Sequence, residues 1–370
     1  MKTKLVNLTS CLYYKAILLK SRLEAEGIEA YLANVNLIQS DIASGVNVLV
    51  KDSDLKKALQ LMHSLDNEVG KDEKILKKKA ESINKIICPV DFSDDSLNAA
   101  HFALWLAVHL KAEVKFVYTY NPVQPMANVF PDSFSYQIEM GNILEDDLLI
   151  SKQKMQKFKE GITDYVSKKL PSKVKFSTHL IANDPFRGIP AFCKKFKSAM
   201  VVMGTKGLGK SKNYVAGSVA LNTIEKVNIP VMVIPKDFKF AAVENFNIIY
   251  LTDFDEKDFS SFRKLMSIAG IFNPEIHCVH LEHEKSVVSQ VMLDELTDKL
   301  KDIYSSYRVD CTLIKSHDAP KSINSFIKSK GVNLLAMSEK KRNFLFQFFN
   351  KSFIKEMLFN VNVPLLVFKY

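Results

Sequence analysis

The stretch Gly204–Ser211 satisfies the Walker A pattern G-x-x-x-x-G-K-[ST], with Lys210 at the lysine position. In a P-loop of this kind, backbone N–H groups cradle the phosphates, the lysine binds the β- and γ-phosphates, and the final hydroxyl binds Mg²⁺. Such a loop joins a strand directly to a helix that begins within the motif. A helix beginning at Lys210 would hold Gly217 in its interior at a cost of about 1 kcal/mol. A P-loop is therefore only the alternative interpretation of this stretch.

A longer pattern accounts for the same region without that cost. Gly204, Gly207, Gly217 and Ser218 follow the spacing G-x2-G-x9-G-S. Glycines let the backbone pass where a Cβ would collide with a ligand. A helix that begins at Gly217–Ser218 offers free N–H groups and a positive dipole end to phosphate oxygens, with the serine as its cap. The pattern therefore predicts a phosphate-binding site.

The elements around this pattern alternate between strands and helices, which is typical of a parallel sheet covered on both faces. We expect a buried first strand that ends near Asp91, and further strands that end near Thr119 and Gly204. In open parallel sheets, ligands bind outside the carboxyl ends of the strands, where the winding direction reverses. Asp91 and Gly204 can flank such a crevice. Expected helices cover residues 93–112, 146–170, 185–197 and 217–228.

The same order of elements returns after Glu244. Residues 247–269 match residues 85–107, which places Asp253 on Asp91, and residues 334–368 match residues 200–234 without a gap. The repeat predicts two copies of one α/β domain, at residues 83–236 and 244–370. The fold class is therefore α/β, with two tandem doubly wound domains whose mainly parallel sheets have five strands each.

A small α/β module precedes the two copies. Residues 1–66 show a βαββα pattern, which predicts a ferredoxin-like regulatory module, and residues 67–82 form a charged linker. Around "LKSRLEAEGIEAYL", the module resembles a small prokaryotic domain family described as signal-transducing.

The glycine pattern, the "PVDFS" of the first strand and the "IPVMVIP" of the last together resemble the ATP-binding branch of the universal stress protein family. The resemblance implies that Asp91 and Thr119 contact adenosine, and that the glycines and Ser218 hold ribose and phosphates. It implies ATP, or ADP or AMP, as the ligand, with a divalent cation such as Mg²⁺. The implied binding residues are Pro89, Val90, Asp91, Thr119, Met203, Gly204, Thr205, Lys206, Gly207, Lys210, Gly217, Ser218 and Val219.

The second copy has lost most of this pattern. Gly204 is replaced by Ser338, Gly207 by Lys341 and Gly217 by Lys351, and only Ser352 keeps its type. We expect no ATP binding of the family type in this copy. In the family, the last strand self-associates across a dimer axis, so here residues 229–235 and 363–368 can pair within one chain. A homodimer is left open.

The composition limits which ligands and which cellular locations we expect for this protein. The net charge of +10 suits an anionic ligand, but acidic and basic residues are interspersed and no motif favours nucleic acid. Five scattered cysteines without C-x-x-C spacing predict a reducing, cytoplasmic location, and no apolar run is long enough for a membrane helix. His277, His280 and His283 recur every three residues, so they face alternate sides of a strand and cannot share a metal.

The sequence therefore predicts a regulatory, stress-responsive nucleotide-binding protein with no catalytic residue and at most slow ATP hydrolysis. A P-loop ATPase that depends on Lys210 and a ligand-free interaction scaffold are the alternatives.

Overall fold

The computed structural model describes residues 5–11, 16, 19–20, 23–24, 26–33, 46–62, 83–121, 134–196, 199–205, 217–240, 246–252, 256–282, 287–339 and 351–369. The chain divides into two compact units, Met1–Lys79 with Glu282–Ser305, and Ala80–Leu281 with Ser306–Tyr370. The first domain predicted from the repeat lies in the second unit, and so does the second domain apart from Glu282–Ser305.

The smaller unit contains a three-stranded antiparallel sheet of β1 (Leu5–Cys11), β2 (Ala30–Ala33) and β3 (Val46–Lys51), in the order β1-β3-β2. Burial alternates along the central strand β3, so every second side chain faces the core. The helix α8 (Val287–Ile303) falls in the same unit. The predicted strands are present, and the ferredoxin-like assignment stays a prediction.

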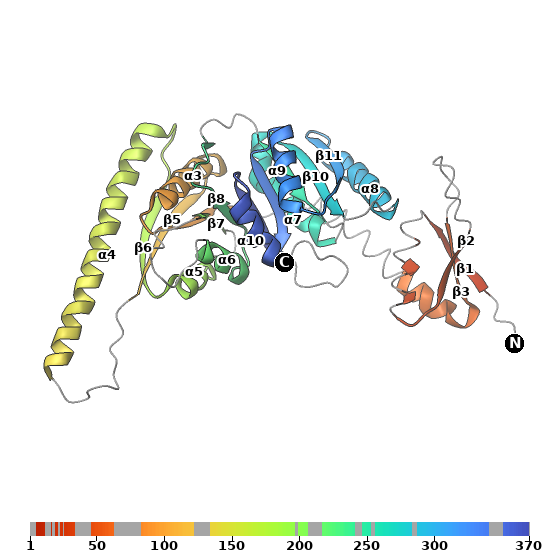
Figure 1. The fold of residues 1–370 in the computed structure, drawn as a ribbon, viewed down its shortest axis with the longest axis horizontal. Helices are drawn as coiled ribbons and strands as arrows, with labels where there is room; N and C mark the ends of the chain where they lie inside the picture. Colours follow the sequence, from red (N-terminus) through yellow and green to blue (C-terminus); the bar gives the residue numbers. More distant parts are fainter. Residues whose placement is uncertain are drawn as a thin grey trace. The chain divides into compact units, whose positions relative to one another are not determined.

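The larger unit is built on one ten-stranded sheet in the order β11-β10-β9-β12-β13-β8-β7-β4-β5-β6 (Figure 1). The first set of strands is parallel and comprises β4 (Lys85–Pro89), β5 (Glu113–Tyr120), β6 (Phe176–Ala182), β7 (Ala199–Gly204) and β8 (Val231–Ile234). Its helices are α3 (Asp94–Leu110), α4 (Phe134–Lys169), α5 (Pro185–Cys193) and α6 (Ser218–Lys226). The α/β class and the mostly parallel sheet are thus confirmed.

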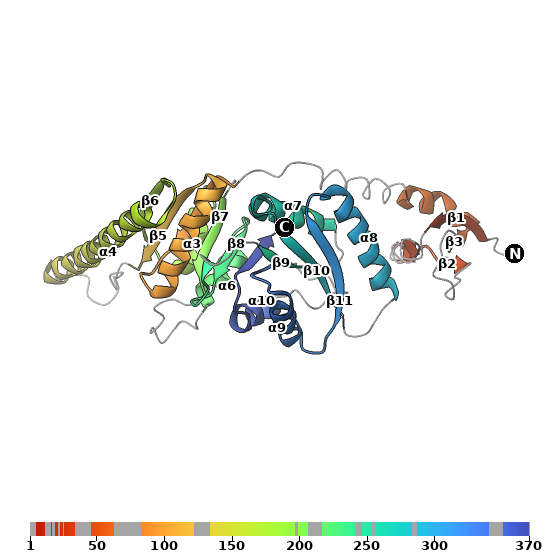
Figure 2. The same ribbon diagram turned by 90° about the horizontal axis from the view of Figure 1, so that it is seen from above.

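The second set of strands comprises β9 (Asn247–Leu251), β10 (Glu275–Glu282), β11 (Arg308–Lys315), β12 (Leu334–Glu339) and β13 (Leu365–Lys369). Strands β10, β9, β12 and β13 are parallel to one another. The helices of this set in the larger unit are α7 (Glu256–Ala269), α9 (Ala319–Lys330) and α10 (Lys351–Asn360). Helix α7 lies on the opposite face of the strands from α9 and α10 (Figure 2).

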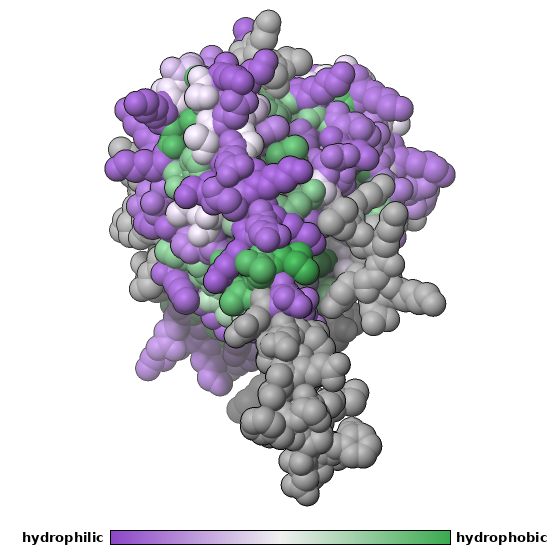
Figure 3. All heavy atoms as spheres, turned by 90° about the vertical axis from the view of Figure 1, so that its left-hand side faces the viewer, coloured by the Kyte–Doolittle hydropathy of each residue, from purple (hydrophilic) through white to green (hydrophobic). Residues whose placement is uncertain are grey.

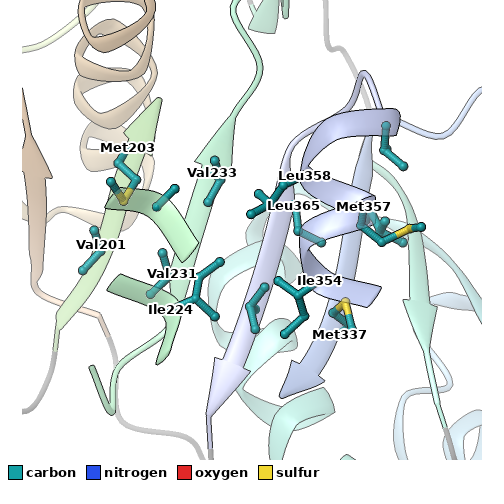
Figure 4. Close-up of a cluster of buried hydrophobic side chains, with 14 of the residues drawn as sticks. Val201, Met203, Ile224, Val231, Val233, Met337, Ile354, Met357, Leu358 and Leu365 are labelled. Atoms are coloured by element: carbon teal, nitrogen blue, oxygen red, sulfur yellow. The ribbon is translucent and has the colours of Figure 1, made fainter. Parts of the chain in front are cut away.

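The two sets meet where β8 and β13 pair antiparallel, with Leu366 opposite Met232. A continuous apolar core crosses this seam, as the side chains from α6, β8, β13 and α10 show (Figure 4). Ile224, Val233, Ile354, Met357 and Leu365 are among its buried members. Burial of this many aliphatic side chains, at about 1.5–3 kcal/mol each, makes the seam part of the folded core.

Helix α4 is longer than the sequence predicted. It begins at Phe134 rather than near Asp146, because no proline interrupts residues 134–169 and a helix tolerates Gly141. Its inner side buries Ser151, Met155 and Ile162, whereas hydrophilic side chains predominate on the side of the molecule shown in Figure 3. Within the described residues, no helix combines the length and hydrophobicity needed to cross a bilayer.

The connection between the two sets is held by Asn98 of α3. The side-chain N–H₂ group of Asn98 donates to the carbonyl oxygens of Pro235, Lys236 and Phe238 at 3.2, 3.1 and 3.3 Å. Close by, the ring of Trp105 stacks on Phe272, with centroids 5.2 Å apart. The segment that leads from the first set of strands to the second is therefore fixed to α3.

We expect Asn98→Ala to lower the free energy of unfolding by about 0.5–1.5 kcal/mol, because two part-buried carbonyls and one exposed carbonyl lose their side-chain donor. Urea unfolding monitored by the fluorescence of Trp105, the only tryptophan, measures this. Leu97→Ala, at an adjacent position whose side chain is exposed, is the matched control. Equal unfolding midpoints for the two variants would refute the role given to Asn98.

Candidate functional site

The carboxyl ends of β4 and β7 lie side by side, and this is where the winding of the first set reverses. From β4 the chain proceeds through α3 to β5 on one side, whereas β7 pairs with β4 on the other. Continued past the strand ends, the registers of β4 with β5 and with β7 place Asp91 level with Thr119 and with Thr205. Three residues that the family resemblance implied as ligand contacts are thus level with one another on three neighbouring strands.

Asp91 shapes the turn between β4 and α3. Its Oδ1 accepts the backbone N–H of Ser93 at 3.1 Å and the hydroxyl of Ser93 at 2.5 Å. Ser93 in turn caps α3, since its Oγ accepts the N–H of Ser96 at 3.2 Å. Between them, Phe92 has a φ of 64°, a left-handed conformation that is uncommon outside glycine. The carboxylate is therefore held in a fixed position at the edge of the sheet.

Gly204 ends β7 against the first turn of α3. A Cβ at this position would lie 3.0 Å from the carbonyl oxygen of Asp95 and 3.1 Å from its carbonyl carbon. Contacts this short are tighter than most Cβ contacts in proteins, and backbone cannot easily move aside, so glycine is the residue that favours this packing of β7. From the sequence we predicted that Gly204 lets the backbone approach a ligand, whereas in the structure it lets the backbone approach α3. This packing role is one that the sequence analysis missed.

Gly217 and Ser218 open helix α6, as the spacing predicted, but their roles at the helix start differ from the expectation. The N-cap residue is Gly217, with a φ of 77° and no side-chain cap, and Ser218 is the first helical residue rather than the cap. A Cβ at Gly217 would lie 3.3 Å from the carbonyl oxygen of Thr205. The N-terminal end of α6 therefore lies beside the end of β7, with its first N–H groups not capped by a side chain.

The remaining predicted residues fall into two groups. Pro89 and Met203 are buried within their strands. The N–H of Val90 donates to the carbonyl oxygen of Val117 at 2.9 Å. Val219 packs against the core. Lys206, Gly207 and Lys210 lie outside the described residues, and so does the lysine on which the P-loop alternative depends.

Thr119 is directed toward α5. Its Cγ2 lies 3.0 Å from the position that a Cβ on Gly188 would take. On the other face of β5, Tyr118 packs on Phe92 with ring centroids 4.5 Å apart. Burial raises the pKa of the Tyr118 phenol, and the nearby negative charge of Asp91 raises it further. The sequence analysis did not identify Tyr118, because its contacts depend on the long-range position of α4 and the turn at Phe92.

In the second set of strands, Ser338 occupies the position that corresponds to Gly204. It is buried, and its hydroxyl lies 3.4 Å from the hydroxyl of Tyr250. Helix α10 begins at Lys351, one residue before Ser352, while Asp253 and Lys341 lie outside the described residues. A buried serine thus stands where the first set has the glycine that packs against α3.

His277, His280 and Cys193 are engaged within the fold. Within β10, Nδ1 of His277 contacts Oδ1 of Asp310 at 2.5 Å, while Nδ1 of His280 contacts the carbonyl oxygen of Thr252 at 2.8 Å. His283 lies outside the described residues. Burial raises the pKa of the Cys193 thiol to about 12, so this thiol is not a ready nucleophile. No group of three metal-ligating side chains occurs within the described part of the chain.

Comparison with known proteins finds a family model that matches the first set of strands. Residues 82–235 match the model of the universal stress protein family. Among curated proteins, the universal stress protein MJ0531 of Methanocaldococcus jannaschii is 28% identical over 165 residues, which cover 45% of this chain and 89% of that protein.

Solved structures show the likeness of fold. A universal stress protein from Archaeoglobus fulgidus DSM 4304 has a TM-score of 0.52 at 16% identity, and the match covers 78% of this chain and 98% of that one. UspA from Lactobacillus plantarum has a TM-score of 0.33 at 16% identity, over 42% of this chain and 99% of its own. The first likeness therefore extends well beyond residues 82–235.

Proposed function

We propose that the universal stress protein domain at residues 82–235 binds an adenine nucleotide, and that its occupancy regulates an interaction of the protein. The observation that carries the proposal is the place of the α6 N-terminus. Gly217, at a φ of 77°, starts this helix beside Thr205 and the carboxyl edge of the sheet. Backbone N–H groups and the positive end of the helix dipole at such a position favour phosphate oxygens.

The described residues fit such a ligand. Ser218 would hold a phosphate through its hydroxyl and backbone N–H, and the fixed carboxylate of Asp91 would accept hydrogen bonds from the adenosine part. The phosphates supply the negative charge that the helix start attracts, and Mg²⁺ would accompany ATP. We propose no catalytic residue and at most slow hydrolysis, since no general base for hydrolysis is identified.

We also propose that residues 244–370 are a second, degenerate copy of the domain that pairs with the first in place of a partner subunit. Three observations support this: the sequence repeat, the strand order mirrored across the β8–β13 seam, and the Archaeoglobus structure that matches 78% of the chain. With Ser338 in place of Gly204, the copy serves as a partner rather than a second nucleotide site. Residues 1–66 remain, by proposal, a regulatory module.

The proposal is tested on the purified full chain. Mass spectrometry of any released small molecule identifies a co-purified nucleotide, and titration calorimetry with ATP, ADP and AMP, with and without Mg²⁺, ranks the ligands. If none of the three nucleotides gives a heat of binding or a thermal shift, the result would support the ligand-free scaffold instead. Loss of both binding and turnover in Lys210→Ala, with turnover in the parent, would support the P-loop alternative.

A pair of matched serine variants locates the site. We expect Ser218→Ala to weaken nucleotide binding by about two- to tenfold, the equivalent of one hydrogen bond. Ser352→Ala, at the corresponding position of the second set, is expected to leave the affinity unchanged. Calorimetry on both variants measures the difference, and an equal loss in both would contradict a site confined to the first set.

A further inference from the structure

Helix α6 is contacted at both of its ends by residues of the second set of strands and helices. At its N-terminal end, the ring of Phe359 lies close to Gly217: a Cβ on this glycine would be 3.4 Å from the Cζ atom. At its C-terminal end, the Nζ of Lys369 donates to the carbonyl oxygens of Ile224, at 3.4 Å, and Glu225. The helix that opens the proposed nucleotide site is therefore positioned by a part of the chain more than 130 residues away.

The contact at the C-terminal end supplies donors that the helix itself lacks. The last carbonyls of any helix have no intrahelical N–H partner, and a cation near them also interacts favourably with the helix dipole. In α6, the N–H of Val227 donates to Thr223 at 3.0 Å and ends the intrahelical ladder. Lys369, at the end of β13, then satisfies the next two carbonyls. The second set thus completes the C-terminal end of α6.

The contact at the N-terminal end confines the glycine that starts the helix. Phe359 is at the last turn of α10, and its side chain remains 43% exposed although its ring edge rests on Gly217. In the repeat, Phe359 corresponds to Glu225. A carboxylate at this place would repel phosphates, whereas a phenyl ring excludes water from one side of the helix start without adding charge.

We infer that Phe359 and Lys369 are positioning residues for the nucleotide site. Through them the second set of strands and its helices, here called the second half of the larger unit, hold α6 at both ends. The inference rests on the proposed function, since it assigns regulation to the same site. The second half then affects nucleotide affinity without binding a nucleotide: any event that shifts α10 or β13 also shifts the helix start.

Two variants test the inference, each with a matched control in the second half. The control for Phe359→Ala is Ile271→Ala, which removes another exposed apolar side chain. The control for Lys369→Met is Lys328→Met, on the exposed side of α9. The first readout needs no ligand: hydrogen exchange at the α6 amides from Leu221 to Val227. We expect exchange to be about two- to fivefold faster in both test variants than in their controls.

The second readout is calorimetry with ATP on the same four proteins. We expect Phe359→Ala and Lys369→Met to bind ATP about two- to fivefold more weakly than the parent, and the controls to match it. Unchanged exchange and unchanged affinity in both test variants would overturn the inference. If the parent binds no adenine nucleotide, the proposed function fails, and the exchange data alone decide whether the second half positions α6.

Discussion

Replacement of Gly217 by valine is expected to reduce nucleotide affinity at least about a hundredfold, the largest loss from any single substitution in the proposed site. The φ of 77° at this position is strained for any residue with a Cβ and most of all for a β-branched one, at about 1–3 kcal/mol. The new side chain would also meet the carbonyl oxygen of Thr205 at 3.3 Å and the ring of Phe359. To relieve both, the helix start must move, and the N–H groups aimed at the phosphates move with it.

Calorimetry with ATP measures the loss, and a thermal melt shows whether the variant is folded. Gly217→Ala is the graded control: it keeps the strain but adds only one methyl group, so we expect an intermediate affinity. Lys210→Ala separates this proposal from the P-loop alternative, because a P-loop would lose more from the lysine than from the glycine. A larger loss in Lys210→Ala than in Gly217→Val would contradict the proposed site.

Replacement of Met357 by alanine is expected to lower the free energy of unfolding by about 2–5 kcal/mol, and to do so across the whole of the larger unit. Met357 is fully buried on α10, in the core that runs across the β8–β13 seam. Its removal leaves a cavity whose cost adds to the lost burial. Because this core continues to Ile87 of β4, the destabilisation must reach the first set, where the β4 amides report it.

Urea unfolding monitored by Trp105 fluorescence reports on both sets, because this α3 ring stacks on Phe272 of the second set, whereas hydrogen exchange at the β4 amides reports the first set alone. The matched control is Leu149→Ala on α4, where the side chain is 53% exposed and we expect a change within about 0.5 kcal/mol. If Met357→Ala unfolds α10 while the β4 amides exchange as in the parent, the two sets fold independently and the account of the seam is wrong.

The sequence predicted the elements of the large sheet well, because each strand is a short buried apolar run between clear helix signals. Strand β7 and the start of α6 fall within one residue of their predicted positions, since Gly217 ends any helix pattern upstream of it. The start of α4 was missed by twelve residues, although Tyr136, Met140, Ile143 and Leu144 already recur at helical spacing before Asp146.

The candidate site was predicted less completely than the fold. Asp91 lies level with Thr119 and Thr205 because β4 is the neighbour of both β5 and β7, an order of strands that the motifs implied. The contacts of Gly204 with Asp95 and of Gly217 with Phe359 leave no local signal in the sequence, because each joins elements that are distant along the chain. A glycine pattern shows where backbone must pass closely, but not whether a ligand or another helix is the neighbour.

The antiparallel pairing of β8 with β13 has a consequence for behaviour in dilute solution. Two strands on separate chains associate according to protein concentration, whereas two strands on one chain meet at a tether-limited effective concentration of the order of millimolar. The ten-stranded sheet therefore stays assembled however dilute the protein becomes, and its joining requires no encounter between molecules.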